Sequence, residues 1–231
     1  MTTKYFRTTL FVIAGMLCAA SYGEELPELI SRLQKTNGNG PVLGMVHIED
    51  HMSKKKDESS KKPEKADLII TADANTLTVS VSGDITESRI FREFSLLRAK
   101  ELVSYGPALA SKLAEMKLVE RGTDTHEGKP CNLWRLKSEK KESKLGMSAT
   151  QRRDLELKID AEGYPVAGSF KTQVVSKILF IKISSESHCE QHYERSGGRL
   201  MLVFDKREES VKHGKSTDKR IATTTVEVKK D

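Results

Sequence analysis

Aromatic residues and cysteine are scarce in this sequence. Phe, Trp and Tyr together make up 6% of the 231 residues, and the chain has one tryptophan and three cysteines. Proteins that bind single-stranded nucleic acids interleave aromatic side chains with a basic groove, and that pattern is missing here. We therefore expect no nucleic acid partner.

Recognisable catalytic motifs are missing as well. The sequence has no G-x-S-x-G nucleophile elbow, no phosphate-binding Walker loop and no G-x-G-x-x-G dinucleotide fingerprint. Carboxylates are abundant, but no pair stands in an apolar setting that would raise a pKa for acid catalysis. The sequence predicts a protein that is not an enzyme and that needs no cofactor.

Only the beginning of the chain carries an uninterrupted apolar run. Residues 10–20 are apolar, follow the basic Lys4 and Arg7, and are too short to span a bilayer, which takes about 20 apolar residues. This order is typical of a secretory signal peptide. We expect residues 1–23 to be removed after Gly23, with cleavage after Ala20 or Ser21 as the alternative.

Residue Cys18 offers a second interpretation of this leader, as a lipoprotein signal. The bulky Met16 and Leu17 precede it where a small residue is needed, so lipidation is disfavoured. The richest apolar stretch downstream, residues 174–183, is interrupted by two lysines. The sequence therefore predicts a periplasmic or secreted protein with no transmembrane segment after signal cleavage.

The charge balance is only mildly basic. The chain has 39 basic and 33 acidic residues, and removal of the leader leaves 37 against 33, a formal net charge of +4. Weak contact with an anionic membrane surface is compatible with this excess. Residues 53–65 and 206–220 are densely charged, and we expect both to be flexible loops within a single domain of residues 24–231.

Hydrophobic periodicity predicts a few helices and many strands. Residues 26–33 have helical spacing, and residues 96–118 form the best helical region, which Gly106-Pro107 should divide into two short helices. After that the chain is a succession of hairpins, with turns near residues 127, 162 and 197. Consecutive hairpins favour an antiparallel sheet. The predicted fold class is α+β: a curved, unclosed, barrel-like antiparallel meander with a few covering helices.

The stretch SESHCEQHY (185–193) raises the question of what its cysteine does. Cys131 and Cys189 remain after signal removal, and two thiols in an exported protein favour a disulfide, although two free thiols are the alternative. His188, Cys189 and His192 are weak candidates for a metal site. Adjacent residues on a strand point to opposite faces, and structural zinc sites use four ligands, so we expect no metal.

Two stretches resemble consecutive hairpins of the LolA-like periplasmic lipoprotein carriers. They are MKLVERGTDTHEGKPCNLWRLK (116–137) and LELKIDAEGYPVAG (155–168). The resemblance implies an unclosed barrel whose concave face is capped by helices and whose apolar interior holds acyl chains of a lipid or lipidated protein. It also implies five lid residues on the helical region: Leu97, Leu102, Leu109, Leu113 and Met116.

A second hypothesis needs no ligand. In it the same five side chains simply fill a solid core, and the protein is an exported structural or interaction module whose charged loops meet a partner. A concave apolar cavity would separate the two hypotheses.

Overall fold

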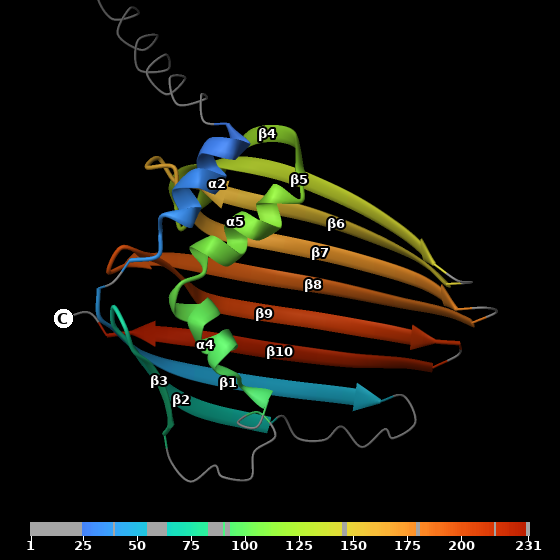
Figure 1. Ribbon diagram of the computed structural model, residues 1–231, viewed down its shortest axis with the longest axis horizontal. Coiled ribbons are helices and arrows are strands. Elements are labelled where there is room, and N and C mark those ends of the chain that lie inside the picture. The colour runs from blue at the N-terminus through green and yellow to red at the C-terminus, as the bar shows by residue number, and fades with distance from the viewer. Residues whose placement is uncertain are drawn as a thin grey trace, which may run out of the picture.

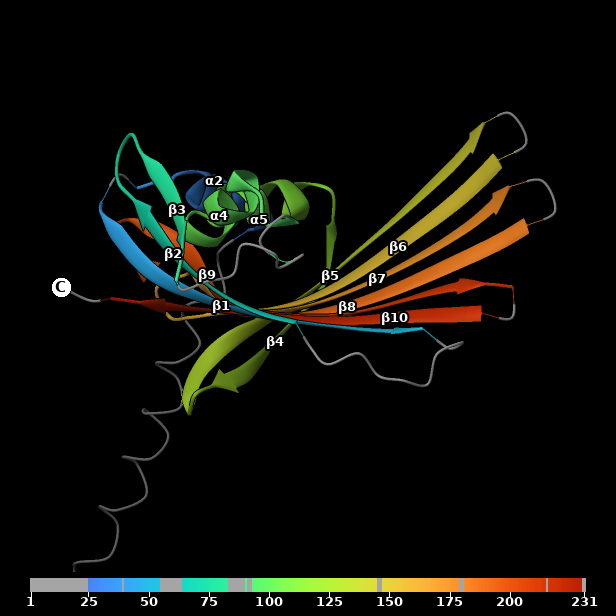
Figure 2. The ribbon, with the colours of Figure 1, turned by 90° about the horizontal axis from the view of Figure 1, so that it is seen from below.

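A computed structural model of the chain describes residues 25–38, 40–54, 64–82, 90, 93–144, 147–178, 181–214 and 216–229. The predicted signal peptide and residues 55–63 of the predicted loop 53–65 lie outside these residues. The described chain forms one open, ten-stranded antiparallel sheet with three helices on one face (Figures 1 and 2). The prediction of an unclosed antiparallel sheet with a few helices is confirmed, and the fold is mainly β.

The three hairpins predicted with turns near residues 127, 162 and 197 are present. The helices are α2 (Leu26–Gln34), α4 (Leu96–Val103) and α5 (Gly106–Ala114). The strands are β1 (Val42–Lys54), β2 (Glu64–Ala72), β3 (Leu77–Val81), β4 (Lys117–His126), β5 (Lys129–Lys144), β6 (Met147–Ile159), β7 (Pro165–Ile178), β8 (Ile181–Ser196), β9 (Arg199–His213) and β10 (Ser216–Val228).

Local sequence signals explain where the helices begin. At α2, Glu25 and Glu28 form a capping box, in which the Glu25 N–H donates to Glu28 Oε2 over 3.1 Å. At α4, the Ser95 hydroxyl oxygen accepts from the Arg98 N–H. Pro107 stands in the first turn of α5, where its missing N–H costs nothing. The predicted break between two short helices is therefore confirmed.

The strand order places β3 and β4 at opposite edges of the sheet. The order is β3-β2-β1-β10-β9-β8-β7-β6-β5-β4, so these two strands are consecutive in the chain but farthest apart in space. The segment that connects them contains α4 and α5. Figure 1 shows this helical segment crossing the sheet from the β1–β2 side to the β5–β6 side. We call residues 96–114 the strap.

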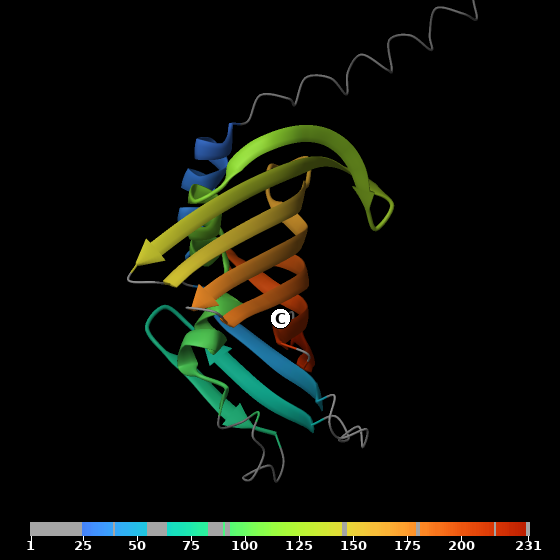
Figure 3. The same cartoon turned by 90° about the vertical axis from the view of Figure 1, so that its right-hand side faces the viewer.

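The helices cover only one end of the sheet. In the strands that they cover, alternate residues point to the helices and are buried, as Leu68 and Ile70 of β2 and Leu155 and Leu157 of β6 show. Strands β6 to β10 continue well beyond the helices (Figure 2), and the β4–β5 hairpin curls away at one edge (Figure 3). The helix-bearing face thus has a covered half and an open half.

The structure corrects the prediction of a loop at 206–220. Residues up to His213 belong to β9 and those from Ser216 belong to β10, and the two strands pair in register up to the turn. Charged side chains are tolerated in these central strands because the open half of the sheet leaves them in contact with water. They also form pairs along one face, such as Lys206 Nζ with Glu208 Oε1 at 2.9 Å.

Close contact between α2 and α5 requires glycine at position 106. A Cβ atom there would lie 2.8 Å from the Leu33 carbonyl oxygen and would also overlap the Thr36 side chain. We expect Gly106→Ala to lower the free energy of unfolding by about 1–3 kcal/mol, because the two helices must separate. Urea denaturation measures the change.

Gly122→Ala is the matched control. A Cβ atom at Gly122, on β4, has no heavy atom within 4 Å, so the change should stay within about 0.5 kcal/mol. Equal effects of the two substitutions would contradict the close packing of α2 on α5.

Candidate functional site

The strap is attached to the sheet by few directional contacts. Within the described chain, one backbone hydrogen bond joins them, from the Tyr105 N–H to the Leu200 carbonyl oxygen over 2.7 Å. Tyr105 lies between α4 and α5, so this bond holds the middle of the strap. The remaining attachment is made by side chains.

The five predicted lid residues do not share one face. Leu102, Leu109 and Leu113 are fully buried against the sheet, and Met116, just after α5, is 7% exposed. Leu97 is 69% exposed, so the prediction is wrong for this residue. Leu97 stands five positions before Leu102, which places it about 140° away around the helix. The inner face of α4 consists instead of Ala99, Leu102 and Val103.

A buried polar cluster lies beneath the strap. The hydroxyl groups of Tyr105 and Tyr193 donate to Gln191 Oε1 over 2.8 and 2.9 Å, and their rings stack with centroids 5.5 Å apart. Gln191 Nε2 and the Cys189 thiol donate to Asp205 Oδ1 over 3.1 and 2.8 Å. Side chains of β8 and β9 are therefore linked by hydrogen bonds into one network, and this network also binds Tyr105 of the strap.

Cations complete this cluster from both sides. Arg98 of α4 donates to Asp205 Oδ2, and Arg207 Nη2 lies 3.6 Å from the same oxygen. Lys112 of α5 donates to Tyr105 Oη over 2.6 Å. The strap thus contributes Arg98 and Lys112, while the sheet contributes Asp205 and Arg207.

The cluster fixes the protonation of its members. Burial alone would raise the pKa of Asp205, but Arg98 and the hydrogen bonds from Cys189 and Gln191 outweigh it and lower that pKa. Burial and the neighbouring Asp205 carboxylate raise the pKa of Cys189 to about 12. Cys189 is therefore a neutral hydrogen-bond donor at physiological pH and a poor nucleophile.

Two cavities open along the edges of the strap. The α5 rim cavity, of about 240 Å³, lies between α5 and strands β6 to β9, and its lining includes Lys112, Met116, Phe170 and Arg207. The α4 rim cavity, of about 360 Å³, lies beside α4 and has Ile90, Phe94, Arg98, Asp205 and Arg207 in its lining. Arg207 borders both cavities.

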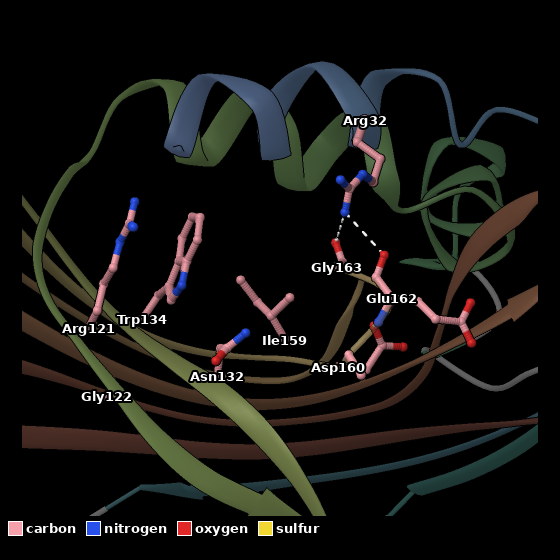
Figure 4. A pocket seen from close by; sticks show the side chains of 10 residues that line it. Arg32, Arg121, Gly122, Asn132, Trp134, Ile159, Asp160, Glu162 and Gly163 are labelled. Carbon is pink, nitrogen blue, oxygen red and sulfur yellow. Dashed lines mark hydrogen bonds between the residues drawn. The ribbon is translucent and has the colours of Figure 1, made fainter. Parts of the chain in front are cut away.

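A third cavity, of about 180 Å³, lies between α2 and strands β4 to β6 (Figure 4). Its arginines are engaged by the protein itself. Arg32 Nη1 donates to the carbonyl oxygens of Gly163 and Glu162 over 2.7 and 3.2 Å, and Arg121 lies 4.9 Å from the centroid of the Trp134 ring. Trp134 belongs to the core. We therefore interpret this cavity as structural, because its residues hold α2 against the end of the sheet.

The predicted disulfide is contradicted. Cys131 and Cys189 are both buried, free thiols. Residues paired across a sheet share a face, and the strand registers pair Cys189 with Phe170, Phe170 with Leu155, and Leu155 with Leu136 of β5. Cys131 stands five positions before Leu136 on the same strand, and an odd separation puts two residues on opposite faces. The two thiols therefore point to opposite faces of the sheet. Strands β6 and β7 also separate them by about 14 Å, beyond the reach of a disulfide.

His188, Cys189 and His192 do not converge either. Cys189 points under the strap, whereas the two histidines lie on the opposite face of β8. His188 Nε2 lies 3.1 Å from Ser169 Oγ, and the His192 ring packs against Phe204. Among the residues described, no group of three His, Cys, Asp or Glu side chains is arranged to hold a metal ion.

Comparison with known proteins adds no assignment. The chain matches no protein-family model and no curated protein. Within the described ranges, the structure has no helix of the length and apolarity that crossing a membrane requires.

The sequence does not predict the residues that make the most polar contacts in the cluster: Tyr105, Gln191, Asp205 and Arg207. Their only sequence signal is Asp205 at the end of the apolar stretch 200–204, and it becomes informative once the pairing of β8 with β9 is known.

Asp205→Asn tests the electrostatic part of the strap attachment. Arg98 would lose its buried anionic partner and keep only Glu101, at 3.4 Å, so we expect the free energy of unfolding at pH 7 to fall by about 1–3 kcal/mol. Asp154→Asn, at an exposed pair with Lys137 (3.7 Å), should cost at most about 1 kcal/mol. Urea denaturation of both variants gives the comparison.

The pH dependence of Asp205→Asn follows from the lowered pKa of Asp205. Its carboxylate stabilises the fold fully above the unfolded-state pKa of 3.8, and this contribution disappears as the pH falls through the lower folded-state value. The stability difference between wild type and Asp205→Asn should therefore be constant from pH 7 to about pH 5 and shrink below pH 4. A difference that persists at pH 2 would contradict the assignment.

Two free, buried thiols give a chemical prediction. The protein purified from an oxidising compartment should have the mass of a fully reduced chain, and its melting temperature should not change on addition of dithiothreitol. Iodoacetamide at pH 8 should alkylate neither cysteine until the protein is unfolded, because Cys189 and Cys131 are both buried and both have raised pKa values. A mass lower by two hydrogen atoms would show that Cys131 and Cys189 form a disulfide and would contradict the free thiols.

Proposed function

We propose that the protein is a non-enzymatic carrier that binds the acyl chains of a lipid or lipid-modified protein between the strap and the sheet. We further propose that it is exported and acts in the periplasm or outside the cell. The strap would be the lid, and the LolA-like resemblance of two hairpins supports this assignment. The single observation that carries the proposal is the path of the strap from one edge of the sheet to the other.

This path allows the strap to move without disturbing the sheet. Both its ends join edge strands, and the backbone pairing of all ten strands is independent of it. Lifting the strap breaks one backbone hydrogen bond and the polar contacts of Arg98 and Tyr105 with the sheet, and it uncovers the leucines of its inner face. Because α5 packs closely on α2, the two helices must either move together or separate. Lid motions of this kind admit ligands in many proteins.

The inner surface of the strap suits replacement by acyl chains. Leu102, Leu109 and Leu113 contact a sheet surface of Leu, Ile and Val side chains, and such contacts are not directional. Methylene groups of an acyl chain can therefore take the place of these leucine contacts. The rim cavities, with Phe170 and Met116 on one side and Ile90 and Phe94 on the other, give entry points beside the strap.

A solid-core interaction module is the second candidate. The complete burial of Leu102, Leu109 and Leu113 favours it, because the described interior is filled by the protein's own side chains. The two candidates differ in whether an acyl chain enters this layer.

The single tryptophan reports on that entry. Trp134 is 4% exposed and belongs to the core beneath the helices. If the proposal is correct, a brominated long-chain fatty acid should quench Trp134 fluorescence with saturation. At a free ligand concentration one hundred times Kd, it should also stabilise the fold by about 2.7 kcal/mol.

The same fatty acid without bromine is the matched control, since it has the same chain and carboxylate but no heavy-atom quencher, and it should bind without quenching the buried ring. Saturating binding of the long chain without any quenching would place the chain elsewhere on the surface. No binding and no stabilisation would favour the solid-core module.

A further inference from the structure

The α5 rim cavity combines positive charge with an apolar wall. Its cationic lining comes from three separate elements: Lys112 from α5, Arg153 from β6 and Arg207 from β9. The described lining of the cavity includes no carboxylate. The Lys171 side chain does not add to this charge, because Lys171 pairs with His188 and so lies on the opposite face of the sheet. Because like charges are gathered without an acid among them, the cavity is complementary to an anion.

The cations of this cavity are incompletely neutralised. No carboxylate of the described residues lies within 4 Å of Lys112 Nζ, which rests over the Phe170 ring at 5.4 Å from its centroid. Arg207 lies 3.6 Å from Asp205 and 3.9 Å from Glu209, both beyond hydrogen-bond distance, and its third neighbour is the Cys189 sulfur, a weak acceptor. The guanidinium of Arg207 therefore keeps donor capacity for another oxyanion.

Arg153 is paired but shares its partner. Its Nη1 lies 2.7 Å from Glu115 Oε2, the oxygen that Lys140 Nζ approaches to 2.9 Å. Partial dehydration lowers the pKa of Lys112, which shows that this ammonium is less well solvated than one on the open surface. An added dianion would improve the electrostatic environment of all three cations.

The inner wall of the cavity is continuous with the core. Met116 belongs to the buried cluster, and Phe170 packs against it. The volume of about 240 Å³ corresponds to roughly eight water molecules at about 30 Å³ each. That space suits a headgroup and the first carbons of a chain, with the remainder of the chain directed into the layer between strap and sheet.

We propose that the α5 rim cavity binds the phosphate monoester group of an anionic amphiphile through Lys112, Arg153 and Arg207. This inference rests on the proposed carrier function and names the chemical class of its ligand. A phosphate monoester carries about −1.5 to −2 charges at pH 7, which matches three cations better than a single carboxylate does. Arginine also binds phosphate oxygens in a bidentate manner, which fixes the head while the chain enters.

The α4 rim cavity provides an internal contrast. Its lining holds the carboxylates of Glu93, Glu101, Asp205 and Glu209 beside its arginines. Such a balanced lining offers no net attraction to an anion. The headgroup is therefore assigned to the α5 side of the strap.

Isothermal titration with decyl phosphate, decanol and inorganic phosphate tests the inference. Wild type should bind decyl phosphate at least tenfold more tightly than decanol. Lys112→Gln and Arg207→Gln should each weaken decyl phosphate binding by roughly tenfold or more and leave decanol binding unchanged. Lys177→Gln, on the opposite face of β7, is the matched control and should change neither affinity.

The outcomes separate the headgroup site from the carrier function. Equal binding of decyl phosphate and decanol, unaffected by the substitutions, would overturn the phosphate site and retain the carrier. Binding of inorganic phosphate alone, lost in Lys112→Gln, would retain the anion site for a free phosphate and overturn the carrier. Absence of binding by all three probes would overturn both. Because Arg207 contacts Asp205, a folding defect in its variant leaves Lys112→Gln as the deciding measurement.

Discussion

The crossing of the sheet by the strap is the constraint on which the rest of the structure depends. Strands β3 and β4 are the two edges, and the chain between them must traverse the helix-bearing face. Two short helices with apolar inner surfaces make that crossing and bury the core as they do so. The core is thus closed by a segment that adds no strand pairing of its own. The strap, which covers the core, and the sheet, which supports it, are therefore separable parts.

Much of this scaffold could be predicted from the sequence, because its signals are local. Gly128, Gly163 and Gly197 adopt positive φ at hairpin turns, where glycine is favoured, and the Gly106-Pro107 break divides the strap. The charged segment 206–220 was misassigned because a strand was expected to bury one face. In the open half of the sheet that expectation does not hold, and backbone pairing with β8 and β1 is sufficient.

The site could not be predicted, because it depends on registers that accumulate across strands. Whether Cys131 and Cys189 share a face is decided by three successive pairings, and one slip reverses the answer. Register shifts occur at Lys158/Ile159 and at His192/Tyr193. The second shift lies beside Gln191, so sequence alternation alone could not show that Gln191 and Asp205 both point under the strap.

A polar cluster beneath a lid needs an explanation, since well-packed apolar side chains of similar volume commonly stabilise a protein as well or better. The directional contacts of Asp205 and Gln191 specify one position of the strap on a sheet whose leucines would accept several. These polar contacts therefore fix the position of the strap on the sheet, whereas the apolar contacts contribute most of the free energy of its attachment.

The arrangement of charges also limits the cost of lifting the strap. If Arg98 leaves with α4, its other partner Glu101 leaves on the same helix, with Nη1 and Oε2 3.4 Å apart. Asp205 stays on β9 with Arg207, two residues along the same strand and 3.6 Å away. Each charge of the central ion pair thus keeps a partner on its own side, and opening does not leave a lone buried charge, whose desolvation would otherwise hold the strap shut.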